Sequence, residues 1–193
     1  MRFRRLPVAV ALVVLVTLPA GACSTRAAPG PGGPPPAAAT RPPASSAAPL
    51  PAGADPSDIS RMVCGKAQPD IAAALGVTPV RVDTPAWVDH VYSCRYVYPT
   101  GSFVVSVKEL SSWPETFAYV DGLGQQLGNT RELHGLGEGA FTTSNGSVVA
   151  RKDWKVLLVD DSALPAQFGS PPTTPASTAL IVANVIMGCW AGD

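Results

Sequence analysis

The chain has 193 residues, of which 46% are hydrophobic, and it carries 14 basic and 14 acidic side chains. Its length suits one or two domains. Three of the basic residues, Arg2, Arg4 and Arg5, belong to an N-terminal segment, and without them 14 less 3 leaves 11 basic residues against 14 acidic ones. The remainder has no excess of positive charge for binding phosphates, so the composition argues against nucleic acid as a partner.

Residues 1–22 have the features of a bacterial export signal. The three arginines precede an apolar run from Leu6 to Leu18. That run is too short to cross the hydrocarbon core of a membrane, which takes about 20 helical residues. We therefore expect a signal peptide rather than a permanent membrane helix.

The residues around Cys23 allow two interpretations of how the signal is removed. Ala20-Gly21-Ala22 fits an ordinary signal-peptidase site, which predicts a secreted protein. Small residues directly before a cysteine also resemble a bacterial lipobox, although Ala20 stands where leucine is usual. We expect cleavage before Cys23 and lipidation of its thiol, which would anchor the chain to the outer, extracytoplasmic face of the cell membrane. Secretion is the alternative.

Residues 23–57 are expected to form a tether. Ten prolines lie between Ser24 and Ser57, and Leu50 is the one large apolar residue there. Such a segment cannot bury enough apolar surface to offset its loss of conformational entropy, so it is predicted to be disordered and stiffened by proline. A spacer through cell-wall polymer is the favoured interpretation, and a ligand for a polyproline-binding domain is the weaker one.

Apolar periodicity and turn residues begin at Asp58, so residues 58–193 are predicted to form one extracytoplasmic domain. A short helical turn is expected from Asp58 to Cys64. Three longer helices are indicated by caps and spacing: Pro69–Leu75 with Gly76 as its left-handed cap, a helix opened by the capping box Ser112–Glu115 with Phe117, Val120, Leu123 and Leu127 on one side, and an apolar helix from Pro175 to about Met187.

Alternating apolar and polar residues predict about six to seven strands. Val91–Lys108 reads as a hairpin, and Asn145-Gly146 reads as a type I′ turn in a second hairpin. The other strands are expected at Val80–Val82, Thr130–Leu133, Ala140–Thr143, Ser147–Arg151 and Trp154–Val159. We expect an α+β fold in which two or three helices pack on one face of an antiparallel sheet. Each half has a helix ending in Leu-Gly followed by a strand and a hairpin, which suggests a duplicated unit.

The layout of the whole chain carries a resemblance. Small residues before Cys23, a Pro/Ala tether, Cys64 in a helix and Cys94 in a hairpin resemble the small envelope lipoproteins of actinobacteria. Many of these carry domains of unknown function, some similar to the Mog1/PsbP-like α+β fold. The resemblance implies an envelope location and an α+β domain, and it supplies no catalytic residues.

The cysteines allow more than one pairing. If Cys23 is lipidated, Cys64, Cys94 and Cys189 remain. We expect a Cys64–Cys94 disulfide, which would tie the first helix to the central hairpin and leave Cys189 as a buried thiol. A Cys94–Cys189 bond is the competing pairing.

No pattern in the chain predicts a reaction. His90 and His134 are the only histidines, and neither has a partner at zinc-ligand spacing. We therefore expect no catalytic residue, no metal and no cofactor. Tyr92, Tyr96 and Tyr98 lie on one face of a strand, where they either fill the core or line a cleft or partner surface.

Two functions fit these features. One is a membrane-anchored, non-catalytic interaction or sensing domain with an envelope protein as its partner. The alternative is a carrier that holds a lipid or other apolar envelope molecule in a cavity between sheet and helices. A filled core with an exposed aromatic patch would favour the first function, and a deep apolar cavity would favour the second.

Overall fold

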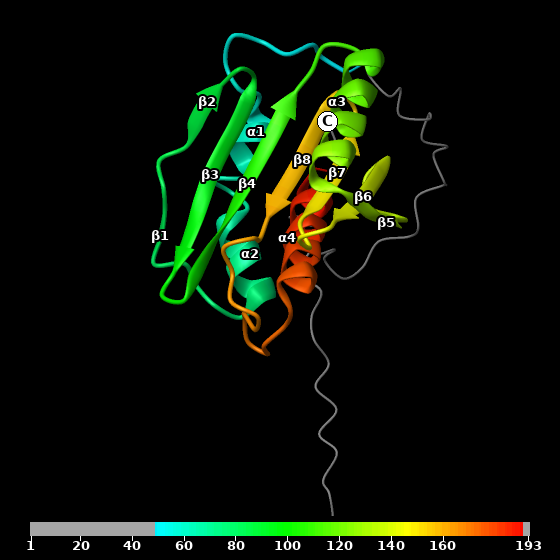
Figure 1. Ribbon diagram of the computed structural model, residues 1–193. Helices are drawn as coiled ribbons and strands as arrows, with labels where there is room; N and C mark the ends of the chain where they lie inside the picture. The colour runs from blue at the N-terminus through cyan, green and yellow to red at the C-terminus, as the bar shows by residue number, and fades with distance from the viewer. Residues whose placement is uncertain (1–48, 191–193) are drawn as a thin grey trace, which may run out of the picture. The chain divides into compact units, whose positions relative to one another are not determined.

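A computed structural model describes residues 49–190 of the chain. The predicted signal peptide, Cys23 and the tether as far as residue 48 lie outside the described residues. The described part has an α+β fold in which an antiparallel sheet carries helices (Figure 1). The predicted fold class is confirmed.

The sheet has eight strands over the described residues, in the order β1–β3–β4–β8–β7–β6–β5, with β2 paired to β3 as well. The strands are β1 (Arg81–Val82), β2 (Ala86–Val88), β3 (Val91–Tyr98), β4 (Gly101–Glu109), β5 (Asn129–Leu133), β6 (Gly139–Thr143), β7 (Val148–Lys152) and β8 (Lys155–Asp160). All pairings are antiparallel, and β4 joins the two halves by pairing with β8. Strand β2 was not predicted, because its three residues are too few to display alternation.

Both predicted hairpins are present, but one turn differs in type. A type I′ turn needs positive φ at both central residues. In the loop between β6 and β7, Gly146 has φ of 98° while Asn145 is absent from the residues with positive φ. The loop is instead closed by two hydrogen bonds: Gly146 N donates to Thr143 O at 3.1 Å, and Thr143 N donates to Ser147 O at 2.9 Å.

Four helices accompany the sheet in the described part of the chain. They are α1 (Asp58–Met62), α2 (Gln68–Leu75), α3 (Trp113–Leu127) and α4 (Pro175–Cys189). Helix α2 ends at Gly76, whose φ is 64° and whose added Cβ would lie 2.0 Å from the carbonyl oxygen of Ser170. Both the left-handed backbone and the close approach require glycine. Between residues 49 and 190, no helix is long and apolar enough to cross a membrane.

The helices cover both faces of the sheet, so the prediction of helices on one face is wrong. Helices α1, α2 and α4 pack on one face, here called the inner face, and α3 packs on the other, the outer face (Figure 1). The reason lies in β7 and β8. Ala150 and Leu157 point into the inner core, while Val149 and Val156 belong to a separate apolar cluster under α3. The helices α2 and α3, which precede the two halves of the sheet, therefore lie on opposite faces.

The inner core is built from helix and strand residues that are almost wholly buried. They include Val63, Ile71, Tyr96, Phe103, Val105, Val107, Leu157, Val182 and Ile186. Side chains from α2 and α4 share one apolar cluster with those of β3, β4 and β8 on this face. Each buried side chain of this size contributes about 1.5–3 kcal/mol, so the inner core is the main source of stability.

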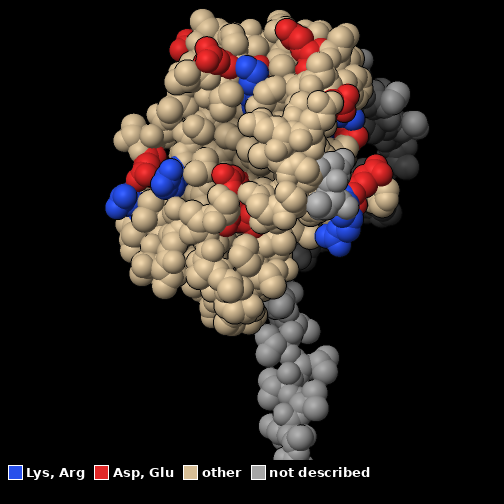
Figure 2. Space-filling model, viewed as in Figure 1, with Lys and Arg blue, Asp and Glu red and all other residues tan. Residues whose placement is uncertain are grey.

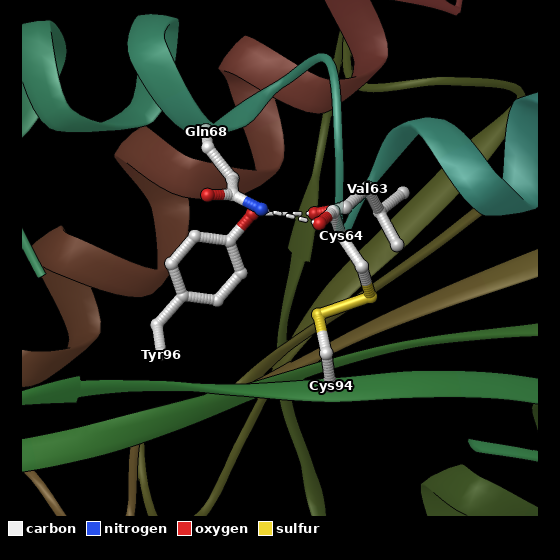
Figure 3. The surroundings of a disulfide bond; sticks show 5 residues. All are labelled: Val63, Cys64, Gln68, Cys94 and Tyr96. Atoms are coloured by element: carbon white, nitrogen blue, oxygen red, sulfur yellow. Dashed lines mark hydrogen bonds between the residues drawn. A yellow bond between two sulfur atoms is a disulfide. The ribbon is translucent and has the colours of Figure 1, made fainter. Parts of the chain in front are cut away.

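A disulfide joins Cys64 to Cys94 and fixes the start of the domain to β3 (Figure 3). Beside it, the Tyr96 hydroxyl donates a hydrogen bond to Val63 O at 2.5 Å, and the Gln68 side-chain amide donates to Cys64 O. The predicted Cys64–Cys94 pairing is confirmed. The turn between α1 and α2 is thus held by one covalent and two hydrogen bonds.

Cys189 differs from expectation. It is partly exposed at the end of α4, and its sulfur lies 3.8 Å from a carboxylate oxygen of Asp70. No free cysteine occurs in the described residues, so the prediction that Cys189 is a buried thiol is wrong. The neighbouring residues Met187 and Trp190 take the positions that face the core.

The residues just before α1 are bound to the sheet. Ala52 N donates to Leu110 O at 3.1 Å. Ser57 donates to the Glu109 carboxylate through both its backbone N at 2.8 Å and its hydroxyl at 2.7 Å. Residues 52–57 therefore belong to the folded domain and not to the tether, and they enter it beside the junction of β4 and α3.

Candidate functional site

A partly exposed group of aromatic and charged side chains lies where α3 meets the sheet. We call it the aromatic–arginine cluster, and its members are Trp113, Phe117, Glu138 and Arg151. The rings of Trp113 and Phe117 stack with centroids 5.8 Å apart and an interplanar angle of 26°. These residues are four apart on α3 and so share one side of the helix.

Phe117 is 50% exposed, although the sequence placed it with the apolar stripe of its helix. The side chains that pack against the sheet are Tyr119, Val120 and Leu123. At 100° per residue, Phe117 points about 110° away from the centre of that stripe. Its ring therefore flanks the helix and stays accessible to solvent.

The start of α3 is fixed by its cap, which in turn positions Trp113. The Ser112 hydroxyl accepts a hydrogen bond from Glu115 N at 3.4 Å, as the capping box predicted. The Glu115 carboxylate accepts from Ser111 N at 2.9 Å, one residue earlier than in the standard box. Trp113 is thus held in the first turn of a capped helix.

Arg151, from β7, lies against both rings. Its guanidinium carbon is 5.3 Å from the Trp113 ring centroid and 5.0 Å from the Phe117 centroid. This placement satisfies the geometry of a cation–π contact, which contributes about 0.5–1 kcal/mol at an exposed site. Only 14% of the Arg151 side chain is exposed, so the rings shield most of it.

Glu138 holds the guanidinium in that position. Arg151 Nη1 donates to Glu138 Oε2 at 2.9 Å, and Nη2 donates to the Glu138 carbonyl at 2.6 Å. The two residues are also joined through their backbones, because Glu138 N donates a hydrogen bond to Arg151 O at 2.7 Å. The preceding Gly137 has φ of 60°, and an added Cβ would lie 2.4 Å from the same oxygen. Glycine is therefore needed to bring Glu138 this close to β7.

The cluster lines an open hollow of about 510 Å³. Among residues 49–190, no acceptor is found for the indole N–H of Trp113. This N–H is therefore available to donate a hydrogen bond to a ligand. Figure 2 shows the side of the molecule on which α3 lies, where uncharged side chains cover most of the surface. Tryptophan and arginine are enriched among residues that dominate binding energy at interfaces. The cluster has the composition of a binding site.

The predicted tyrosines do not form such a surface. Tyr96 and Tyr98 are core residues, and Tyr92 is half-buried at the margin of the inner core. Burial raises the pKa of Tyr98 to about 12, and burial raises the pKa of Tyr96 further. Tyr98 packs edge-on against Phe168 with centroids 4.8 Å apart. The alternation of β3 directs all three side chains toward the helices.

A second hollow, of about 420 Å³, lies at the end of the sheet beside the β3–β4 turn. Its lining is mainly apolar and includes Val77, Tyr98, Phe168 and Pro172. The Tyr98 hydroxyl is buried and has no hydrogen-bond partner in the described part of the chain. This hollow is open and shallow rather than a deep cavity between sheet and helices.

The titratable residues are dispersed. His90, in the turn between β2 and β3, and His134, after β5, are both exposed. Over residues 49–190, no group of three or more His, Cys, Asp or Glu side chains has the geometry to hold a metal ion. Asp161 is almost wholly buried; its Oδ1 accepts from the Ser147 hydroxyl at 3.1 Å and its Oδ2 is unpaired. Burial raises the pKa of this carboxyl.

The chain matches no family model, and searches of curated proteins and of solved structures find no match either. The functional argument therefore depends on the geometry of the chain itself. The aromatic–arginine cluster was missed at the level of sequence because its members come from three separate segments. The one available signal was the pair Trp113 and Phe117, four residues apart and next to a helix cap.

Proposed function

We propose that the protein is an exported, lipid-anchored domain that binds another envelope component without catalysing a reaction. The observation that carries the proposal is the aromatic–arginine cluster. Its two stacked rings are held open to solvent by an arginine that is itself fixed by two hydrogen bonds to Glu138. Preorganised aromatic groups of this kind bind at a low cost in side-chain entropy.

The packing of the inner core supports this function over a carrier. A carrier of the expected kind would hold its cargo between the sheet and the helices. That space is filled by side chains such as Tyr96, Leu157 and Ile186, each fully or almost fully buried. The accessible aromatic surface lies instead on the flank of α3.

Photo-crosslinking in the expressing cell tests the binding role. A benzoyl-phenylalanine at position 117 should form a discrete adduct with one envelope component. The matched control is the same residue at Val80, which is 62% exposed beside edge strand β1. Arg151→Ala should abolish the adduct, because the Trp113 ring and the side chain at position 117 lose the guanidinium that packs against them. Equal adducts from positions 117 and 80 would refute a specific site.

Anchoring is tested separately through Cys23. In the wild type, the mature chain should partition into membranes and carry a diacyl modification on Cys23. Two acyl chains give stable anchoring where one is marginal, since each buried methylene contributes about 0.8 kcal/mol. Cys23→Ala should release the protein or block its processing. Recovery of the wild type from the medium with an unmodified Cys23 would favour secretion.

The hollow beside the β3–β4 turn supports a second candidate, the carrier of a small apolar molecule. Its apolar lining and the unpaired hydroxyl of Tyr98 are the observations in favour. Native mass spectrometry of the mature chain should then detect a bound molecule that is lost in Phe168→Ala. Detection of the bare mass alone would argue against this role.

A further inference from the structure

We propose that the chain's own proline-rich segment, centred on Arg41-Pro42-Pro43, docks on the aromatic–arginine cluster and covers it when no partner is bound. The inference takes the cluster as a binding surface, as in the proposed function, and adds the occupant that regulates it. It does not depend on lipidation.

The first argument is where the segment enters the domain. Ala52 N is hydrogen-bonded to Leu110 O at 3.1 Å and also to the Ser111 hydroxyl at 3.3 Å. Trp113 follows two residues after Ser111. The proline-rich segment therefore leaves the domain next to the first turn of α3, where the cluster begins.

The second argument is reach. Phe117 lies four residues after Trp113, the first residue of α3, which is about 6 Å along the helix. Pro43 lies six residues before Pro49, where the described chain begins, so these two residues can be at most about 20 Å apart. The segment is thus long enough to lay Arg41-Pro42-Pro43 across the rings, and short enough to keep it close.

The third argument is chemical fit. Proline-rich segments adopt an extended left-handed helix without internal hydrogen bonds, and domains that bind them offer a groove lined by aromatic rings. The cluster has two stacked rings, whose planes differ by 26°, and an indole N–H that can donate to a peptide carbonyl. The Oε1 atom of Glu138 accepts no hydrogen bond in the described residues, so it can pair with the guanidinium of Arg41.

Covalent linkage makes even a weak contact effective. A short flexible linker gives an effective concentration on the order of 1 mM. An intrinsic dissociation constant of about 0.1 mM would then keep roughly nine-tenths of the clusters covered. An external partner would have to displace the segment, so its apparent affinity would be about tenfold weaker than its intrinsic affinity.

The test compares two tether variants of the whole mature chain, residues 23–193, by NMR of the tryptophan indole groups. The Trp113 signal is assigned as the one that disappears in Trp113→Phe. In Arg41→Ala/Pro42→Ala/Pro43→Ala this signal should move, while the signals of Trp87 and Trp154 stay. The matched control Arg26→Ala/Pro29→Ala/Pro31→Ala removes the same residue types farther upstream and should leave the Trp113 signal in its wild-type position.

A peptide of residues 39–50, added to the Arg41/Pro42/Pro43 variant, should return the Trp113 signal toward the wild-type position. The proposal is overturned if the signal is the same in wild type and variant. It is overturned also if both triple variants move it equally, or if its position depends on protein concentration, which would indicate a second copy as the occupant.

Photo-crosslinking from position 117 separates this inference from the proposed function. Release of the cluster in the Arg41/Pro42/Pro43 variant should raise the yield of the partner adduct up to tenfold at subsaturating partner. An adduct whose yield is unchanged in the variant would leave the binding function standing and refute self-docking. A Trp113 signal that responds to the tether, with no adduct in any variant, would refute the external partner and retain self-docking.

Discussion

The two faces of the sheet differ in how completely they are covered. Three helices pack on the inner face and bury side chains from four or more strands, whereas α3 alone packs on the outer face and covers β7 and β8 (Figure 1). On the outer face of β3, Arg95 is exposed and Ser93 is half-exposed. The inner face therefore holds the domain together, and the outer face leaves room for contacts with other molecules.

The largest expected effect is the loss of the inner-face disulfide. Cys64→Ser/Cys94→Ser should lower the free energy of unfolding by about 3–4 kcal/mol, because the bond closes a loop with a sequence separation of 30. For a domain of this size the melting temperature should fall by roughly 10–15 °C, as measured by circular dichroism. A melting temperature that moved by only a degree or two would contradict this assignment.

The next effect concerns the buried carboxylate of Glu109, which is only 4% exposed. Its Oε1 accepts from the backbone N and hydroxyl of Ser57 and from the Ser60 hydroxyl. Glu109→Ala should cost about 2–3 kcal/mol in urea unfolding, since buried donors lose a charged acceptor. Glu109→Gln keeps an acceptor and should cost less. Equal losses for both substitutions would show that these hydrogen bonds contribute little.

On the outer face, the cap of α3 is expected to matter less. Ser112→Ala should cost about 1 kcal/mol, because the N–H of Glu115 loses its acceptor. Hydrogen exchange should quicken in the first turn of α3 and not in α4. Ser112→Thr, which retains a hydroxyl, serves as the control and should restore most of the loss. Faster exchange throughout the domain would mean that the two faces are not energetically separate.

A smaller effect of opposite sign is expected at Asp161. Burial raises its pKa in the folded state above the value of 3.8 that an accessible carboxyl has. This group therefore favours folding below about pH 4 and loses that contribution as the pH rises through its folded pKa. Asp161→Asn should be more stable than wild type at pH 7, and the difference should vanish at low pH. The amide N–H groups of the introduced asparagine would also be buried, which offsets part of the gain in stability. A stability difference between variant and wild type that did not change with pH would refute the raised pKa of Asp161.

The smallest effect on stability is expected from Phe117→Ala. An exposed ring contributes little to folding, so the free energy of unfolding should change by about 0.5 kcal/mol or less. Val120 lies in the next turn of α3, on the side that packs against the sheet, and Val120→Ala should cost about 1 kcal/mol in the free energy of unfolding. The relative size of the two losses tests which side of α3 faces the sheet. A larger loss for Phe117→Ala than for Val120→Ala would mean that Phe117, and not Val120, faces the sheet.

Much of the fold was accessible from sequence because its signals are local. Alternation in Val91–Lys108 predicted the β3–β4 hairpin, and Ser112 and Gly76 marked the helix ends they occupy in the structure. The sequence also contained a signal that helices cover both faces of the sheet. Val148-Val149-Ala150 is an uninterrupted apolar run, and such runs are typical of strands buried on two sides.

The candidate site was less accessible because it is non-local. Trp113 and Phe117 meet Arg151, more than thirty residues later in the chain, only after β7 takes its place in the sheet. The tyrosines of β3 illustrate the opposite error. Their common face was evident from alternation, but alternation alone does not say which face of a sheet the helices will cover.

If the domain is anchored through its N-terminus, as we propose, the attachment of residues 52–57 has a mechanical consequence. Tension along the chain would reach the fold first through the bonds of Ala52 to Leu110 and of Ser57 to Glu109. These contacts lie at the end of β4, an interior strand paired on both sides, so the load would not peel an edge strand from the sheet. If the contacts gave way, unravelling from this end would stop at Cys64, which is covalently bound to β3. The disulfide thereby limits how far a pulled chain can lengthen before the sheet itself must rupture.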